Sequence, residues 1–275
     1  MLRNTDVKKA NVILHDKTAR FFDKENIELF NPFAQRNLEQ RLIKAIYKCK
    51  KNDICCDLAC GTGNLTEKLT PKFEQVVCLD ISKEMIRKCK AKNLGSKIHF
   101  IVGDAENLPF RDNIFDLITM HAALHHLPAP SMALKEIYRA LKNEFGVLYI
   151  DHEPNSINRR KFSEEVKKII RLFGRKLNIK SKKLKPKNEL LFPSDFRIAD
   201  VHATRGFIST EIIKKLKIIG FREIKIAYHD NFSSYFFKLP APLNMLSLID
   251  NQIDKIPAFR NLASKISLYA VKNKL

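Results

Sequence analysis

The 275-residue sequence lacks any segment typical of a membrane-spanning or secreted protein. It contains no run of about 18 apolar residues, the length that a membrane-spanning helix needs. Charged residues interrupt its first residues, so its start lacks the apolar core of a secretory signal peptide. Apolar residues make up 45% of the chain, an ordinary share for a globular protein. We therefore expect a cytoplasmic protein without a transmembrane segment.

The sequence also lacks the usual cysteine and histidine patterns of a metal site. It has no CxxC pair and no histidine at metal-ligand spacing beside its cysteines. All six cysteines lie between residues 49 and 89, whereas a disulfide framework is typical of smaller secreted chains. Cys55 and Cys56 are neighbours on a predicted strand, so their side chains point to opposite faces. We expect no metal site and interpret the cysteines as buried, reduced thiols, which behave as small apolar side chains.

Positive charge is abundant but unevenly distributed. The formal net charge is +20, and residues 159–187 hold 13 Lys or Arg against 2 acidic residues. Such a concentration attracts phosphate groups on nucleic acid, anionic lipid or a substrate. A lysine-rich surface exposed to solvent, without a partner, is the alternative that the composition leaves open.

Short apolar runs alternate with amphipathic stretches along most of the chain. We predict strands over residues 53–59, 75–80, 97–104, 113–123, 145–154, 221–230 and 266–274. We predict helices over residues 64–71, 82–93, 131–143 and 210–220, with Ser82 and Ser131 as N-caps and Gly220 at a C-terminal end. This alternation predicts an α/β fold: a doubly wound, mostly parallel, seven-stranded sheet with helices on both faces.

The rhythm of strands and helices divides the chain into four parts. Residues 1–50 read as an N-terminal helical lid with a break at 31–33, and residues 51–153 as the ligand-binding core. Residues 154–206 form a basic insert or cap, with a helix over about 157–173. Residues 207–275 complete the sheet and carry a mostly helical insert over 231–265. We expect helical cap inserts over one end of the sheet.

Residues 57–65, DLACGTGNL, lie where the first predicted strand meets its helix. In doubly wound sheets ligands bind at such carboxyl ends, and glycines let the backbone approach a ligand closely. Asp80 ends the second strand, where a carboxylate can bind ribose hydroxyls, and Asp104 ends the third, within reach of a purine amine. The loop lacks the third glycine of an NAD fingerprint, and the chain has no GxxxxGK[ST] phosphate loop. These residues together predict a nucleoside site.

Five motifs carry a resemblance to a known family: residues 57–63 (DLACGTG), 79–86 (LDISKEMI), 103–110 (GDAENLPF), 115–127 (FDLITMHAALHHL) and 220–224 (GFREI). With them the sequence resembles the class I S-adenosylmethionine-dependent methyltransferases, in the type 11 group that includes the ubiquinone/menaquinone-biosynthesis enzymes. The resemblance is close over residues 53–152 and looser beyond. Two features depart from the pattern: Ala59 stands where many members have glycine, and residues 141–147 replace the usual Pro-Gly-Gly turn.

The resemblance implies S-adenosyl-L-methionine as the cofactor and S-adenosyl-L-homocysteine as its product. It implies that residues 57–63 wrap the methionine end, that Asp80 holds the ribose, and that the adenine is contacted by residues after strands two and three. The implied cofactor residues are Asp57, Ala59, Cys60, Gly61, Gly63, Asp80, Ile81, Met85, Asp104, Ala105 and His121. For Met85, packing in the core of its helix is an open alternative.

Methyl transfer needs a general base only if the acceptor must lose a proton. The candidate catalytic residues are the histidines near the ends of strands four and five, His121, His125, His126 and His152, beside the acidic Asp151 and Glu153. Residues 15–23, HDKTARFFD, resemble the segment that closes over the cofactor in this group. Phe22 stands there in place of the common tyrosine.

The methyl acceptor is open to several readings. The chain lacks the [DNS]PP[YFW] motif of nucleic-acid amine methyltransferases, and no cysteine follows Cys89 to act as a cytosine C5 nucleophile. We favour a small-molecule or lipid-like acceptor, with the aromatic residues of segment 231–243 lining its pocket. Two alternatives remain: methylation of tRNA or rRNA bound by residues 159–187, and a regulatory protein that binds the cofactor without catalysis. For a lipid-linked acceptor, the same basic segment would bind an anionic membrane surface.

Overall fold

The computed structural model describes residues 3–156, 199, 202, 205–229 and 263–273. The predicted helices over 157–173 and 231–265, and the basic segment 159–187, lie outside the described residues. The division into lid, core, basic insert and C-terminal part therefore stays a prediction.

A seven-stranded sheet forms the centre of the fold, in the order β3-β2-β1-β4-β5-β7-β6. Strands β1 to β5 are parallel, and β7 runs antiparallel to both β5 and β6. The strands are β1 (Ile54–Leu58), β2 (Gln75–Asp80), β3 (Ile98–Val102), β4 (Leu117–His121), β5 (Gly146–Pro154), β6 (Arg222–His229) and β7 (Lys265–Lys272). The prediction of a mostly parallel, seven-stranded sheet is confirmed. The order reverses between β1 and β4, which places a ligand crevice at their carboxyl ends.

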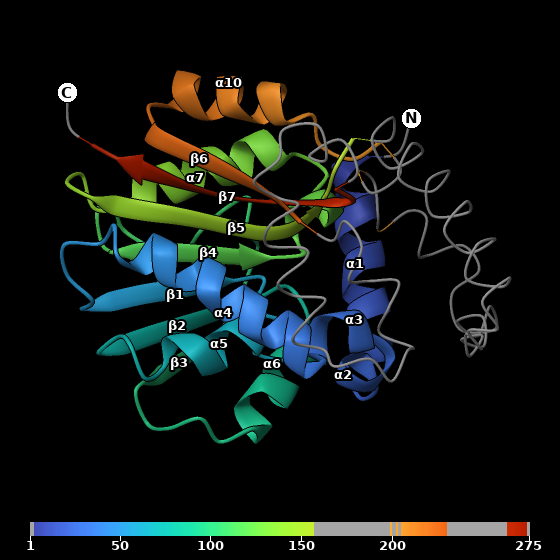
Figure 1. Ribbon diagram of the computed structural model, residues 1–275. Coiled ribbons are helices and arrows are strands. Elements are labelled where there is room, and N and C mark those ends of the chain that lie inside the picture. Colours follow the sequence, from blue (N-terminus) through green and yellow to red (C-terminus); the bar gives the residue numbers. More distant parts are fainter. Residues whose placement is uncertain (1–2, 157–198, 200–201, 203–204, 230–262, 274–275) are drawn as a thin grey trace, which may run out of the picture.

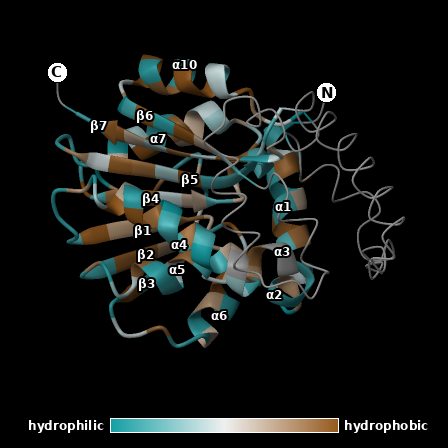
Figure 2. Ribbon diagram, viewed as in Figure 1, coloured by the Kyte–Doolittle hydropathy of each residue, from teal (hydrophilic) through white to brown (hydrophobic). Residues whose placement is uncertain are grey.

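Helices cover both faces of this sheet because alternate strand residues point to opposite sides. The helices are α1 (Asn4–Thr18), α2 (Phe22–Glu25), α3 (Ile27–Phe30), α4 (Pro32–Ile46), α5 (Asn64–Leu69), α6 (Lys83–Ala91), α7 (Pro130–Ala140) and α10 (Ser209–Ile219), with the short 3₁₀ turn η1 (Leu124–His126). Cys55 belongs to the apolar core shared with α4, α5 and α6, whereas Cys56 belongs to the core shared with α7 and α10. The prediction that the two side chains point to opposite faces is therefore confirmed. Figure 2 shows the apolar strands enclosed between these helical layers.

Several element boundaries differ from the sequence-based expectation. The helix predicted from 131 begins at Pro130, with Ala129 and not Ser131 at its cap, because the fixed φ of proline suits the first helical position. The strand predicted over 113–123 shortens to β4, because the backbone amides of residues 113–115 bond to Arg139 and Ala140 instead of β1. The predicted caps at Ser82, which accepts from the Met85 amide at 3.1 Å, and at Gly220 are confirmed.

The N-terminal segment forms four helices with breaks around Phe21, Asn26 and Asn31, more than the one break predicted at 31–33. Asn31 caps α4 by accepting from the Ala34 amide at 2.9 Å. Helices α1, α2 and α3 lie across the carboxyl ends of β1, β2 and β4 (Figure 1). They therefore stand over the crevice at which a ligand is expected.

Among the described residues, no helix is both long and apolar enough to span a membrane.

Candidate functional site

A cavity of about 290 Å³ lies between the carboxyl ends of the strands and the N-terminal helices. Its size and enclosure are those of a small-molecule site. Every cofactor residue predicted from the sequence except Gly63 lines it, and so do all four candidate catalytic histidines. Strand order brings these residues together, although the sequence places them up to about a hundred residues apart. Phe22 of the predicted closing segment also lines the cavity.

The loop after β1 turns with three residues in the left-handed region: Ala59 at φ 55°, Gly61 at 55° and Gly63 at 90°. An alanine in this region is strained, which explains why glycine suits position 59 better. Gly63 does not line the cavity. A Cβ there would lie 2.6 Å from the Cys89 Sγ, so this glycine makes room for α6.

Asp80 ends β2 and anchors this loop. Its Oδ2 accepts from the Gly61 amide at 2.8 Å, and its Oδ1 accepts from the Ser82 amide at 2.8 Å. The side chain is buried and lines the cavity. Each carboxylate oxygen keeps a second lone pair that can accept from a ligand hydroxyl. Burial raises the pKa of Asp80 to about 6, while the two amides oppose that shift.

This raised pKa gives a testable pH dependence. If the ionised carboxylate binds the two ribose hydroxyls, affinity for S-adenosylhomocysteine should fall as pH drops below about 6, because the protonated acid loses an acceptor site. The fall should approach about tenfold per pH unit, the slope of a one-proton linkage. Calorimetric titration between pH 5 and pH 8 measures it. An affinity that stays constant over that range would contradict the assignment.

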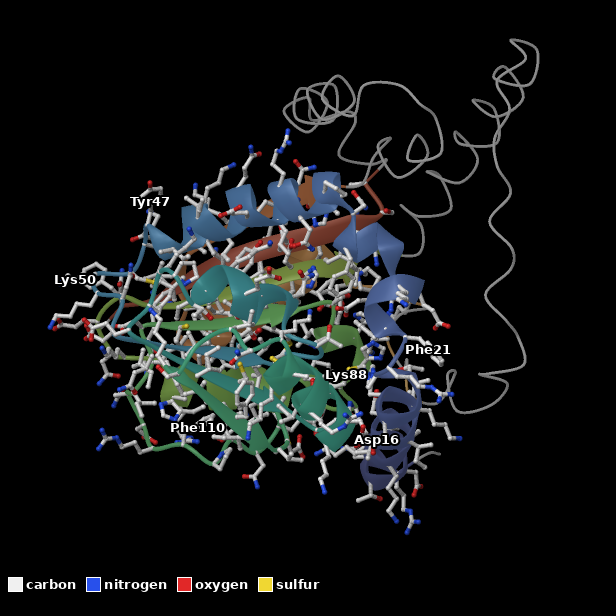
Figure 3. The ribbon with its side chains drawn as sticks, turned by 90° about the horizontal axis from the view of Figure 1, so that it is seen from below. Asp16, Phe21, Tyr47, Lys50, Lys88 and Phe110 are labelled. Atoms are coloured by element: carbon white, nitrogen blue, oxygen red, sulfur yellow. The ribbon has the colours of Figure 1, made fainter. Side chains whose placement is uncertain are left out.

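The N-terminal helices are tied to the cavity rim by side chains that the sequence-based reasoning missed. Lys8 Nζ donates to Asp104 Oδ2 at 2.6 Å and pairs with Glu106 Oε2 at 2.7 Å. Asp16 Oδ1 accepts from the Ser82 hydroxyl at 2.5 Å, and Figure 3 shows Asp16 beside α6. Asp104, predicted to meet the adenine edge, therefore bonds to α1 through Lys8. Of Lys8 and Asp16, only Asp16 lies in the predicted closing segment, residues 15–23.

A second buried cluster lies where β4 meets β5. Arg41 of α4 donates from Nε and Nη2 to the two oxygens of Asp151, at 3.0 and 2.9 Å. His229 Nε2 lies 3.3 Å and His121 Nε2 3.9 Å from the same carboxylate. Burial opposes ionisation of Asp151, but Arg41 and His229 together outweigh it and hold the pKa of that carboxyl well below its usual range. Arg41 and His229 lie far from β4 in sequence, and no local pattern pointed to them.

The four candidate histidines differ in their surroundings. His125 Nδ1 pairs with the buried Glu153 Oε2 at 2.7 Å, and the same carboxylate accepts from the amides of residues 123–125. His126 Nδ1 contacts the Ala199 carbonyl at 3.2 Å. His152 sits at the irregularity of β5 with φ 61°. These contacts give His125 a structural role, because it helps to hold in place the carboxylate that shapes the turn after β4.

His121 lines the cavity with the Asp151 carboxylate behind it, and unlike His125 it does not pair closely with a carboxylate. It ends β4, lines the cavity, and contacts Asn64 Nδ2 through Nδ1 at 3.5 Å. Burial lowers its pKa to about 4, while Asp151 opposes that shift. His121 is therefore neutral at pH 7, with Asp151 placed to stabilise a proton that it gains.

The comparisons with known proteins agree with this geometry. A family model described as "Methyltransferase domain" matches residues 56–150. A demethylmenaquinone methyltransferase of Staphylococcus epidermidis is 29% identical over 212 residues, covering 74% of this chain and 86% of that protein. A demethylmenaquinone methyltransferase of Lactobacillus johnsonii is 33% identical over 153 residues, covering 52% of this chain and 62% of that protein.

A solved structure shares the fold. The Haemonchus contortus phosphoethanolamine N-methyltransferase 2 in complex with S-adenosyl-L-methionine matches with a TM-score of 0.57 and 17% identity, over 94% of this chain and 57% of that chain.

Proposed function

We propose that this chain, which belongs to the class I S-adenosylmethionine-dependent methyltransferases of the type 11 group, transfers a methyl group to a quinol-like small-molecule acceptor. The observation that carries the proposal is the buried Asp80 carboxylate, fixed by the Gly61 and Ser82 amides at the edge of a cavity that also contains His121. The quinol class is supported by the names of the two bacterial relatives.

The residues present fit the cofactor. Asp80 offers free lone pairs to two ribose hydroxyls, and Ile81 and Met85 give an apolar wall beside it. The loop at residues 59–63 leaves space beside its backbone at Gly61, since a Cβ built there would meet no atom within 4 Å. When bound, S-adenosylmethionine supplies a methyl group already activated as a sulfonium. The protein then has to hold the acceptor in line and keep water away.

His121 is the residue that we assign to proton removal from the acceptor. A phenolic hydroxyl that loses its proton makes the neighbouring ring carbon more nucleophilic. Neutral His121 can accept that proton, and Asp151 lies 3.9 Å behind its Nε2 to stabilise the imidazolium. Lys8 of α1 and Phe22 of α2 also line the cavity, and we assign them to keeping water out.

Replacing His121 tests this role. We expect His121→Ala to lower kcat by about 100-fold or more, within the range of general-base removal, with a smaller change in KM for S-adenosylmethionine. The matched control is His99→Ala, because His99 is exposed on β3 and does not line the cavity. Equal kcat values for His121→Ala and the control would show that His121 is not the general base.

The acceptor class is tested by methyl transfer itself. The full chain is incubated with methyl-labelled S-adenosylmethionine and, in parallel, reduced demethylmenaquinone, a phospholipid extract, and tRNA with rRNA. Label in the quinol alone is the expected result. Label in RNA or lipid instead would overturn the quinol assignment and favour the alternatives built on residues 159–187. That segment lies outside the described residues, so RNA or membrane partners, like the cytoplasmic location, stay predictions.

A further inference from the structure

Three buried cysteines meet beneath the loop after β1. Cys60 belongs to that loop, Cys78 to β2 and Cys89 to α6, elements that lie side by side in Figure 1. All three side chains are buried, and their Sγ atoms lie within 4.8 Å of one another. Methyl transfer as derived above uses none of these thiols. Spacing along the sequence gave no sign of the cluster, because its members come from three separate elements.

The arrangement matches what a thiolate-bound metal ion requires. With metal–sulfur bonds of about 2.3 Å, three sulfurs around one ion lie about 4 Å apart. The cysteines reach that separation with a contraction of less than about 1 Å, which side-chain rotation alone can supply. We propose that Cys60, Cys78 and Cys89 form a binding site for a soft monovalent metal ion, with Cu(I) as its best-fitting occupant.

The number of ligands favours Cu(I) over Zn²⁺. Structural zinc sites are almost always four-coordinate and tetrahedral, whereas soft thiolate sites also select Cu(I). Among the described residues, no histidine, carboxylate or fourth cysteine joins the three sulfurs. The nearby Asp57 accepts from Thr66 at 2.6 Å and from Thr119 at 3.2 Å and does not belong to the cluster.

Charge balance also suits a monovalent ion. A Cu(I) ion that displaces one thiol proton from the three cysteines forms one thiolate–metal bond, takes the other two sulfurs as neutral ligands and leaves the buried charge unchanged. A divalent ion would have to displace two thiol protons from the same three ligands to leave it unchanged.

An ion can reach the cluster through the ligand cavity. Cys60 is 7% exposed and lines the cavity, whereas Cys78 and Cys89 do not line it. A ligand that fills the cavity should therefore slow entry of the metal. Metal that binds to Cys60 should in turn fix the loop that carries Gly61.

The test is an anaerobic titration of the full-length apo protein with Cu(I), in competition with a chromogenic Cu(I) chelator. We expect one tightly bound ion per chain. Cys78→Ala and Cys89→Ala should each weaken binding by more than about 100-fold, since outer-shell partners alone are worth about 10- to 100-fold. Cys56→Ala is the matched control, because Cys56 is equally buried but lies on the opposite face of the sheet. Saturating S-adenosylhomocysteine should slow metal uptake by wild-type protein.

X-ray absorption at the copper edge of wild-type protein tests the site independently of any variant that fails to fold. Two or three sulfur neighbours and no nitrogen or oxygen neighbour are expected. Copper coordinated by nitrogen or oxygen, or binding that Cys78→Ala and Cys89→Ala leave as tight as Cys56→Ala does, would overturn the proposal. A failure to detect methyl transfer would leave the metal-site proposal unaffected, because the titration needs neither cofactor turnover nor an acceptor.

Discussion

Asp80→Asn is expected to weaken binding of S-adenosylhomocysteine by about 100-fold or more. The carboxylate serves two tasks: it accepts the Gly61 and Ser82 amides, and it offers lone pairs to the ribose. An asparagine amide would place an N–H donor against a backbone donor or against the ligand. Hydrogen bonds to charged groups are worth about 1.5 to 3 kcal/mol each, so losing two of them accounts for the effect.

Calorimetry with the purified variant measures this loss. Asp112→Asn is the control, because Asp112 pairs with Arg139 at the surface, with 64% of its side chain exposed, and does not line the cavity. The variant should stay folded, since an asparagine keeps the volume of the aspartate. Binding within about threefold of wild type, which is less than about 1 kcal/mol, would contradict the assignment of Asp80 to the ribose.

Arg41→Met is expected to destabilise the folded protein by about 3 to 5 kcal/mol, the cost of leaving a buried charge without its partner. Asp151 is fully buried, and Arg41 binds both of its oxygens at 2.9 and 3.0 Å. Without the guanidinium, the buried carboxylate keeps His229 and His121 as neighbours, and either a proton must bind to one of these three side chains or their surroundings must distort. Urea denaturation of wild-type and variant protein measures the difference in the free energy of unfolding.

Two further variants make this result specific. Lys48→Met removes an ion pair with Glu223 that is exposed to solvent, and it should leave the free energy of unfolding unchanged. The double variant Arg41→Met/Asp151→Asn should recover part of the lost stability, because the unpaired charge is gone. Equal losses for Arg41→Met and Lys48→Met would show that the buried pair does not hold β5 to α4.

The sequence predicted the features that depend on neighbouring residues. Alternating apolar runs predicted the positions of the strands, and Ser82 predicted the start of α6. The loop at residues 57–65 predicted the position of the ligand cavity. The ends of the elements were less predictable. Helix α7 begins at Pro130 and not after a cap at Ser131. The backbone amides of residues 113–115 bond to the end of α7 and therefore do not extend β4. Such competition between tertiary and local contacts has no signature in a short window of sequence.

Contacts between distant segments escaped prediction for the same reason. Arg41 and Asp151 meet only because α4 packs on β5, and Lys8 reaches Asp104 only because α1 crosses the ends of the strands. The cysteine cluster likewise depends on β2 and α6 lying behind the loop. The individual residues were visible in the sequence, but their partners were set by the fold.

The most direct measurement of the central claim is a thermal-unfolding titration of the full chain with S-adenosylhomocysteine, S-adenosylmethionine and NAD. A ligand at a hundred times its dissociation constant adds about 2.7 kcal/mol to the folded state. We predict that both sulfur nucleosides raise the unfolding temperature by a few degrees, with no shift from NAD, since the loop lacks the third glycine of an NAD site. A shift with NAD alone, or with none of the three ligands, would contradict the account.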